Sequence, residues 1–474
     1  MYSSIFTSAV LSFCAAANVV RAVPTLDDST QAALHALGRK ELRSPGSLPN
    51  PKLPAGTDTL SGIENIVVLM MENHSFDNVF GLLGRGDGFT LGHDGQPTAT
   101  NPYANGSIQH AFHMPNTCQL PAQPSQSWTA SHNAFNNGSM NGFVSTAIFD
   151  GSPLLVGGVA MGFYTDEDLP TTLSLAKTFP IGDRYFSSVL GQTFPNRMYL
   201  IAGTSMGITN DNEDMSKLVP PAGTIFNTLD KFNISWTNYV SDFPLGASPE
   251  LFVISDNLTE AVNHKLLPDF FADAQAGTLP QFTFLEPNYT HSSQENPQNV
   301  VFGDAFISDI VHALGSSPQW NKTLFVINYD EHGGYFDHVP PPPALAPDDI
   351  LPTNPLEPIF EGYRRYGMRV PLMVISPYAK VDFVSHKVYD HTSVLALLQK
   401  KFNLPALTFR DANANDLTDF IDFEALEAQK PNFPVLPPIA APGNTTAAVA
   451  CSVTGPGVIP PPGTVSPPDS HHDR

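Results

Sequence analysis

Three short apolar runs constrain the fold of this chain most strongly. They are Ile66 to Met71 (IVVLMM), Leu324 to Asn328 (LFVIN) and Leu372 to Ser376 (LMVIS). Runs of this length without polar alternation are typical of strands that are buried on both faces of a sheet. Each run should therefore form a strand in the core of the protein.

Between these runs, apolar residues recur at the spacing of a helix. This spacing indicates helices that cover the sheet, and Thr392 is a candidate cap for the second of them. Strands that alternate with helices predict an α/β fold with a central, mostly parallel sheet sandwiched by helices. The helical positions are Ile307, Ile310, Val311 and Leu314, followed by Val394, Leu397 and Leu398.

Composition divides the 474 residues into four segments. Residues 1–22 are apolar and end in small residues, which predicts a signal peptide, with a hydrophobic N-terminal helix as the alternative. Residues 23–60 are polar and contain prolines, so we expect a pro-segment or a surface arm. Residues 61–433 should form the catalytic domain, in which residues 208–280 lack clear strand signals and are interpreted as an insertion. Residues 434–474 are rich in Pro, Gly, Ser and Thr, which predicts an extended tail.

Charge limits the partners of the chain. Asp and Glu total 45 against 23 Lys and Arg, for a formal charge of -22. Such a surface repels nucleic acid and anionic membranes, so we expect no nucleic-acid partner. Beyond the N-terminus, no apolar run approaches the roughly 20 residues that a membrane-spanning helix needs.

Two further features favour secretion to the outside of the cell. Several Asn-x-Ser/Thr acceptors predict N-glycosylation, although an additional match at Asn73 lies in a candidate catalytic motif and should stay unmodified. Without Cys14, which would leave with the signal peptide, Cys118 and Cys451 either form one disulfide or remain two buried thiols. The acceptors are Asn105, Asn137, Asn233, Asn257, Asn288, Asn321 and Asn444.

Acidic and amide residues follow two of the predicted strands directly. Glu72 and Asn73 come after IVVLMM, and Asp330 and Glu331 come after LFVINY. Because ligands of α/β sheets bind at the carboxyl ends of strands, we expect these side chains to converge. Four oxygen donors suit a divalent metal cation. The alternative is that they cap helices or lie in surface turns.

A third motif, GQTFPNR from Gly191 to Arg197, carries a candidate nucleophile. Pro195 suits the first turn of a helix, so Thr193 should stand just before a helix N-terminus, where backbone N–H groups favour a phosphate. Metal coordination can activate its hydroxyl to attack phosphorus. Without the other motifs, an ordinary turn with a capping threonine would explain this segment equally well.

Together these motifs resemble a phosphoesterase family that includes bacterial and plant phospholipases C and acid phosphatases, within the alkaline-phosphatase-like superfamily. The resemblance runs from about residue 63 to 423 and includes YDEHGGYFDHVPPP from Tyr329 and DHTSV from Asp390. It implies an alkaline-phosphatase-like fold and a secreted hydrolase of phosphate esters. It also implies metal ligands at Glu72, Asn73, Asp330 and Glu331, substrate binding by Asn73, and a nucleophile at Thr193. His338, which we interpret as a general acid, and His391 also fall in family motifs and are predicted to be catalytic, with a structural role as the alternative for each.

The chain departs from the family at two positions. Gln126 and Asn296 stand where many members carry histidine, and neither amide can deliver a proton at a useful pKa. His132 and His291 are candidate substitutes. Arg184, Arg197 and Arg369 would either bind phosphate or pair with local carboxylates.

Three functions follow from these motifs. The leading one is hydrolysis of a phospholipid or a phosphomonoester by Thr193. A sulfatase shares the spacing of Thr193, Pro195 and Arg197, but its modified residue derives from Cys or Ser, so threonine argues against it. A secreted protein that only binds phosphorylated ligands would explain the two missing histidines but not the retained nucleophile.

Overall fold

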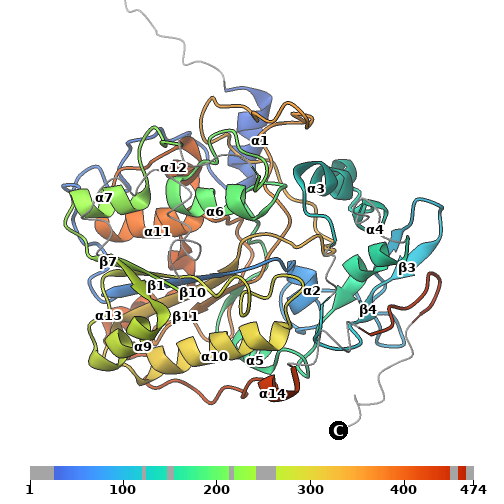
Figure 1. Cartoon of the computed structure of the whole chain (residues 1–474). Helices are drawn as coiled ribbons and strands as arrows, with labels where there is room; N and C mark the ends of the chain where they lie inside the picture. The colour runs from blue at the N-terminus through green and yellow to red at the C-terminus, as the bar shows by residue number, and fades with distance from the viewer. Residues whose placement is uncertain are drawn as a thin grey trace, which may run out of the picture.

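The computed structural model describes residues 26–119, 124–146, 154–212, 218–241, 263–448 and 457–465. Its core is an eight-stranded sheet flanked by helices on both faces (Figure 1). In order across the sheet, the strands are β12 (Val384–Ser385), β6 (Ile181–Gly182), β11 (Leu372–Ile375), β10 (Thr323–Tyr329), β1 (Asn65–Met71), β9 (Phe282–Leu285), β7 (Trp236–Val240) and β8 (His264–Leu266).

The central strands are those that the apolar runs predicted. Every residue of β1 and β10 is buried, as expected of strands covered on both faces. β1 pairs in parallel with β10 and β9, and β7 pairs in parallel with β9 and β8. β11 runs antiparallel to both β10 and β6. The predicted α/β fold with a mostly parallel sheet is confirmed.

Helices cover the sheet in two layers, which Figure 1 shows above and below the strands. Ile307, Ile310, Val311 and Leu314 are buried on α10, as their spacing predicted. Thr392 is the first residue of its helix and not the cap, because His391 occupies the cap position. One layer contains α6 (Thr193–Ala202), α7 (Ile225–Lys231), α11 (Thr392–Phe402) and α12 (Phe409–Asn413), and the other contains α5 (Pro170–Thr178), α9 (Leu267–Ala276) and α10 (Val300–Ser316).

Smaller elements lie beside the carboxyl ends of β1 and β10 (Figure 1). A five-residue helix, α2, follows β1 after a short turn and is entirely buried. The two-stranded pairs β2–β3 and β4–β5 lie outside the main sheet. These elements are α2 (Phe76–Phe80), α3 (Trp128–Phe135), α4 (Phe143–Thr146), β2 (Thr100–Pro102), β3 (Ile108–His110), β4 (Phe112–His113) and β5 (Gly162–Phe163).

The interpretation of residues 208–280 as an insertion is wrong for the part that the structure describes. This stretch supplies β7 and β8, which form one edge of the central sheet, together with α7 and α9. Its strand signal is weak because β7 reads WTNYV and β8 reads HKL, and these polar residues break the apolar run. Residues 213–217 and 242–262 lie outside the described residues.

Both terminal segments pack against the body of the protein. In the N-terminal segment, α1 (Asp28–Ala36) buries Ala33 and Leu34 in a small cluster with Leu345. The C-terminal segment is extended apart from α14 (Thr445–Ala448), and its Leu436 and Ile439 pack on the main core. Among the described residues, no helix combines the length and apolar character needed to cross a bilayer. The predicted signal peptide lies outside the described residues.

Candidate active site

The register of the two central strands brings the predicted acid pairs together. Met71 lies opposite Tyr329 in the parallel pair, so Glu72 and Asp330 leave the same edge of the sheet. The Asp330 N–H donates to the Met71 carbonyl at 3.1 Å, and the Asn73 N–H donates to Asp330 Oδ1 at 3.1 Å. All of these side chains are buried. The expected convergence at the carboxyl ends of the strands is therefore what the structure shows.

Thr193 reaches this cluster from a different element. It is the first residue of α6, one position further into the helix than its motif predicted, and Pro195 lies in the first turn as expected. The Thr193 hydroxyl donates to Asn73 Oδ1 at 3.4 Å, which places the candidate nucleophile directly against a candidate metal ligand. The next N–H of the helix, that of Phe194, donates to Asp211 Oδ1 at 2.8 Å.

Glu331 is positioned by a tight glycine turn. Its Oε2 accepts a hydrogen bond from the Gly333 N–H at 2.7 Å. Gly333 has φ of +63°, and a Cβ there would lie 1.9 Å from the Asn73 carbonyl oxygen, so no other residue fits without movement. His332 is buried, with Nδ1 3.1 Å from Glu331 Oε2, and burial lowers its pKa to about 3.

Arg197 lies one helical turn after Thr193 and holds the carboxylates together. Its guanidinium nitrogens lie 3.1 Å from Asp330 Oδ2, 3.4 Å from Glu72 Oε1 and 3.7 Å from Glu286 Oε1. The Tyr289 ring lies 5.0 Å from the guanidinium carbon. Of the two roles considered for this arginine, the structure supports pairing with local carboxylates.

Negative charge exceeds positive charge in this buried site. Burial raises the pKa of Glu72 and of Glu331 well above the usual value, and it also raises the pKa of Asp330 against the opposing effect of Arg197. Glu72 Oε2 and Glu331 Oε1 are buried without a hydrogen-bond partner. A divalent cation would satisfy these oxygens and offset the excess charge, so the residues present fit such an ion.

His391 contacts the backbone of the site at Asp330. It is fully buried, its Nε2 donates to the Asp330 carbonyl at 2.7 Å, and its Nδ1 lies 3.0 Å from the Tyr185 hydroxyl. Burial lowers its pKa to about 3, so the ring is neutral and holds the backbone of Asp330 in place. Both ring nitrogens are engaged by the protein, which favours a positioning role, and the catalytic role of His391 stays a prediction.

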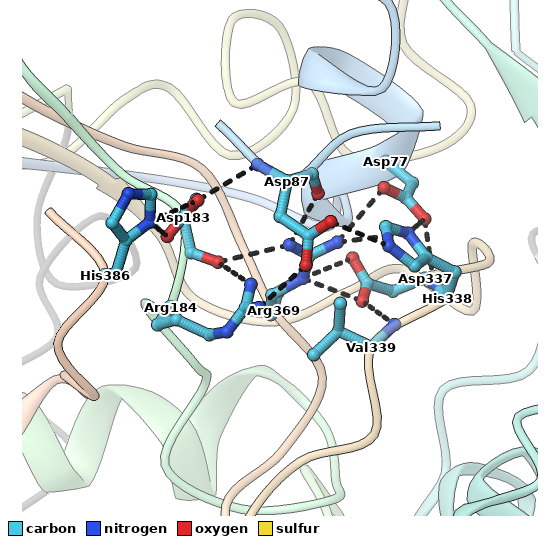
Figure 2. A network of polar contacts seen from close by, with 9 residues as sticks. All are labelled: Asp77, Asp87, Asp183, Arg184, Asp337, His338, Val339, Arg369 and His386. Atoms are coloured by element: carbon cyan, nitrogen blue, oxygen red, sulfur yellow. Dashed lines mark hydrogen bonds and ion pairs between the residues drawn. The ribbon is translucent and has the colours of Figure 1, made fainter. Parts of the chain in front are cut away.

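His338 belongs to a separate polar network (Figure 2). Its Nδ1 lies 2.7 Å from Asp77 Oδ2, and Arg369 contacts both Asp77 at 3.1 Å and Asp337 at 2.9 Å. Burial opposes protonation, but the hydrogen bond to Asp77 raises the net pKa of His338. The contacts of His338 do not include Thr193 or the four predicted ligands, so the geometry does not support its predicted role as general acid.

A compact cluster of potential metal ligands occurs in this second network. Within the described residues, ligand atoms of Asp77, Asp337 and His338 lie within 4.8 Å of one another, whereas Glu72, Asp330 and Glu331 form no equally compact trio. The guanidinium of Arg369 already binds Asp77 and Asp337, the two aspartates of the cluster that includes His338. We therefore assign that cluster to an ion-pair network, and the unpartnered oxygens of Glu72 and Glu331 are better suited to a cation.

The two departures from the family are also buried. Gln126 Oε1 has no hydrogen-bond partner, and Asn296 Oδ1 accepts from the Tyr335 hydroxyl at 3.2 Å. The candidate substitute His132 stacks on Phe360 with ring centroids 4.0 Å apart. The other one, His291, is exposed and packs on Phe302, with 4.3 Å between ring centroids. The hydrogen bonds, ion pairs and ring contacts of these two histidines do not involve Thr193.

Two acidic residues of the site were missed by the sequence analysis. Glu286 directly follows β9 (FTFL), so it shows the same signal as Glu72 and Asp330. Asp211 lies in a loop after α6, and no pattern in the sequence marks it. The pKa of Asp211 is raised to about 7, because burial and, to a smaller extent, the charge of Asp330 outweigh the hydrogen bond from Phe194.

Comparison with known proteins identifies relatives across most of the chain. Phospholipase C B of Mycobacterium tuberculosis is 32% identical over 427 residues, which cover 79% of this chain and 80% of that protein. Non-specific phospholipase C6 of Arabidopsis thaliana is 32% identical over 421 residues, which cover 81% and 77%. A solved structure of a protein in the alkaline phosphatase superfamily from Vibrio parahaemolyticus covers 80% of this chain and 72% of its own, with 12% identity and a TM-score of 0.36. The model of the Phosphoesterase family matches residues 63–405, and with these relatives it shows that the chain belongs to the phosphoesterase family.

Proposed function

We propose that this protein hydrolyses phosphate esters with Thr193 as the nucleophile. The observation that carries the proposal is the contact between the Thr193 hydroxyl and Asn73 Oδ1, at the N-terminus of α6 and beside the buried carboxylates of Glu72 and Asp330. The names of the two relatives described above, both phospholipases C, support phospholipid head groups as substrates. A phosphomonoester is the second substrate class to be tested.

The proposed reaction has two steps. The Thr193 oxygen attacks phosphorus, and the alcohol departs with the proton that Thr193 gives up. Water then hydrolyses the phosphothreonine, which releases phosphate or a phosphorylated head group and restores the hydroxyl. The backbone N–H groups at the start of α6 favour the negative charge of the substrate throughout.

We propose that Glu72, Asn73, Asp330 and Glu331 hold a divalent metal cation. When bound, such an ion lowers the pKa of a coordinated hydroxyl and polarises a phosphoryl oxygen. Arg197 keeps Glu72 and Asp330 at a fixed separation, and His391 fixes the backbone of Asp330. Asn73 also orients Thr193 through the hydrogen bond between their side chains. In the proposed reaction, this contact keeps Asn73 beside the bound substrate, in line with its predicted role in substrate binding.

The test is turnover of the purified protein on p-nitrophenyl phosphate and on phosphatidylcholine, with and without a chelator. We expect Thr193→Ala to lower turnover by about a thousandfold or more, since the nucleophile is lost. We also expect the chelator to abolish turnover and a divalent cation to restore it. Thr193→Ser, which keeps a hydroxyl, is the matched control. Unchanged turnover in Thr193→Ala contradicts the mechanism, and a protein that binds phosphorylated ligands without any turnover is only a binding protein.

We propose that the protein is secreted and glycosylated. Cys118 is disulfide-bonded, which supports an oxidising compartment, and its partner lies outside the described residues. Asn105, Asn137, Asn233 and Asn321 are exposed, whereas Asn73 is fully buried. Endoglycosidase treatment of protein from a eukaryotic culture medium should lower its mass, with peptide mapping showing Asn73 unmodified. Retention of the whole chain inside the cell would contradict this proposal.

A further inference from the structure

Residues 350–360 form an apolar loop on the surface, which we call the 350–360 loop. Its sequence is ILPTNPLEPIF. The relative exposure is 61% for Leu351, 90% for Leu356, 49% for Ile359 and 41% for Phe360. Four large apolar side chains exposed on one short segment are unusual for a surface in contact with water alone, because single exposed residues are the normal case.

The only charged residue of this loop is turned toward the protein. Glu357 Oε2 accepts a hydrogen bond from the Thr209 hydroxyl at 2.7 Å. The outward-facing part of the loop therefore presents aliphatic and aromatic side chains, prolines and uncharged polar groups. Such a surface suits an apolar or zwitterionic partner and not a charged one.

The loop is held in a defined shape. The Thr353 N–H donates to the Gly207 carbonyl at 2.9 Å, and the Trp128 indole N–H donates to the Pro358 carbonyl at 2.9 Å. The Phe360 ring stacks on His132. The exposed apolar side chains are thus presented by an anchored segment, which lowers the entropy cost of docking them on a partner.

The anchors of the loop lead directly to the candidate nucleophile. Thr209, which binds Glu357, lies two residues before Asp211, which accepts from the Phe194 N–H next to Thr193. A Cβ on Gly191 would lie 3.5 Å from the Thr209 carbonyl oxygen and 3.6 Å from the Trp128 ring. Both anchors therefore flank the Gly191 to Arg197 motif, and the apolar loop is tied to the segments next to this motif.

We propose that the 350–360 loop inserts into the surface of zwitterionic phospholipid aggregates and brings the active site to lipid head groups. This inference rests on the proposed hydrolysis of phosphate esters and names the physical form of its substrate. The formal charge of -22 disfavours attraction to anionic lipids, and the acidic neighbours Asp348 and Asp349 add to this repulsion, whereas Glu361 is paired with Arg365. A zwitterionic surface carries no such penalty, and burial of Leu356 and Ile359 among acyl chains supplies the binding energy.

The first experiment measures binding without turnover. Full-length Thr193→Ala protein is mixed with phosphatidylcholine vesicles and separated by flotation. We expect the protein to float with the vesicles, and we expect Leu356→Ser combined with Ile359→Ser to lower the partition coefficient by about tenfold or more. Val381→Ser, which removes a 61% exposed apolar side chain elsewhere, is the matched control and should bind as before.

The second experiment compares substrates in the active protein. The Leu356→Ser and Ile359→Ser pair should lower turnover of phosphatidylcholine vesicles about tenfold and leave turnover of soluble p-nitrophenyl phosphate unchanged. Loss of both activities to the same degree would overturn the inference, as would equal vesicle binding of the variant and its parent. A loss of self-association in the variant, seen by sedimentation without any change in vesicle binding, would assign the loop to a second copy of the chain. Because flotation needs no catalysis, it distinguishes failure of this inference from failure of the proposed chemistry.

Discussion

At the residue scale, the candidate active site is a set of buried acids that one arginine and several N–H groups hold in place. Glu72, Asp330 and Glu331 all have raised pKa values, with burial as the largest cause. Their positions could be predicted from the sequence because each follows a buried strand directly. Asp211 could not be predicted in this way, because it lies in a loop and reaches Thr193 only through the folded chain.

Asp211 gives a prediction about pH. Burial raises its pKa to about 7, so the folded protein keeps a proton on this carboxyl between about pH 4 and 7, where the unfolded chain has lost it. The free energy of unfolding should therefore fall as pH rises through this range and level off above it. Asp211→Asn cannot titrate, so it should remove this pH-dependent fall in the free energy of unfolding. The size of the fall is on the order of 2 kcal/mol after allowing for partial solvent access.

The measurement is chemical denaturation of both proteins in chelator at several pH values. The informative quantity is the difference in the free energy of unfolding between Asp211→Asn and the parent, because other groups cancel in it. A difference that stays constant between pH 4 and 8 would contradict the assigned pKa.

At the scale of single elements, α6 is the element that builds the site. It presents Thr193 and Arg197 one turn apart, so the same helix supplies the proposed nucleophile and the cation that pairs with Glu72 and Asp330. The helix could be predicted from Pro195, although its first residue was placed one position late. The role of Arg197 could not be decided from sequence, because only the fold shows which acids lie near it.

Replacement of Arg197 by Met should destabilise the protein strongly. The change removes the cation from a buried group of three carboxylates, and uncompensated buried charge typically costs about 3–5 kcal/mol. Arg184→Met is the control, because its ion pair with Asp87 is partly exposed and should contribute less than about 1 kcal/mol. Equal free energies of unfolding for the two variants would show that Arg197 does not hold the site together.

At the scale of the whole molecule, the α/β core and its central strands could be predicted, whereas the extent of the sheet could not. β1, β10 and β11 are continuous apolar runs, but β7 and β8 contain polar residues and were interpreted as part of an insertion. The described part of the C-terminal segment contains little regular structure apart from α14. Composition alone does not reveal that it packs against the body.

The C-terminal segment should therefore contribute to stability. The Ala440 N–H donates to Ser174 Oγ at 3.1 Å, the Thr171 hydroxyl donates to the Ala440 carbonyl at 2.9 Å, and Leu436 and Ile439 pack on the core. Leu436→Ser combined with Ile439→Ser should lower the free energy of unfolding by about 1–3 kcal/mol and the Tm by a few degrees. Val435→Ser, at a 71% exposed position, should change neither. Thermal unfolding that is identical in all three proteins would show that the segment does not stabilise the fold.

The central claim is that phosphate passes through Thr193. Active protein mixed with a phosphate-ester substrate and quenched in acid within the first turnover should yield a peptide phosphorylated at Thr193 by mass spectrometry. The same peptide from Thr193→Ser protein should be phosphorylated at the serine, and that from Thr193→Ala should carry no phosphate. Phosphate on any other residue would contradict the account. An unmodified Thr193 would also contradict it if product is still forming and attack on phosphorus is faster than hydrolysis of the phosphothreonine.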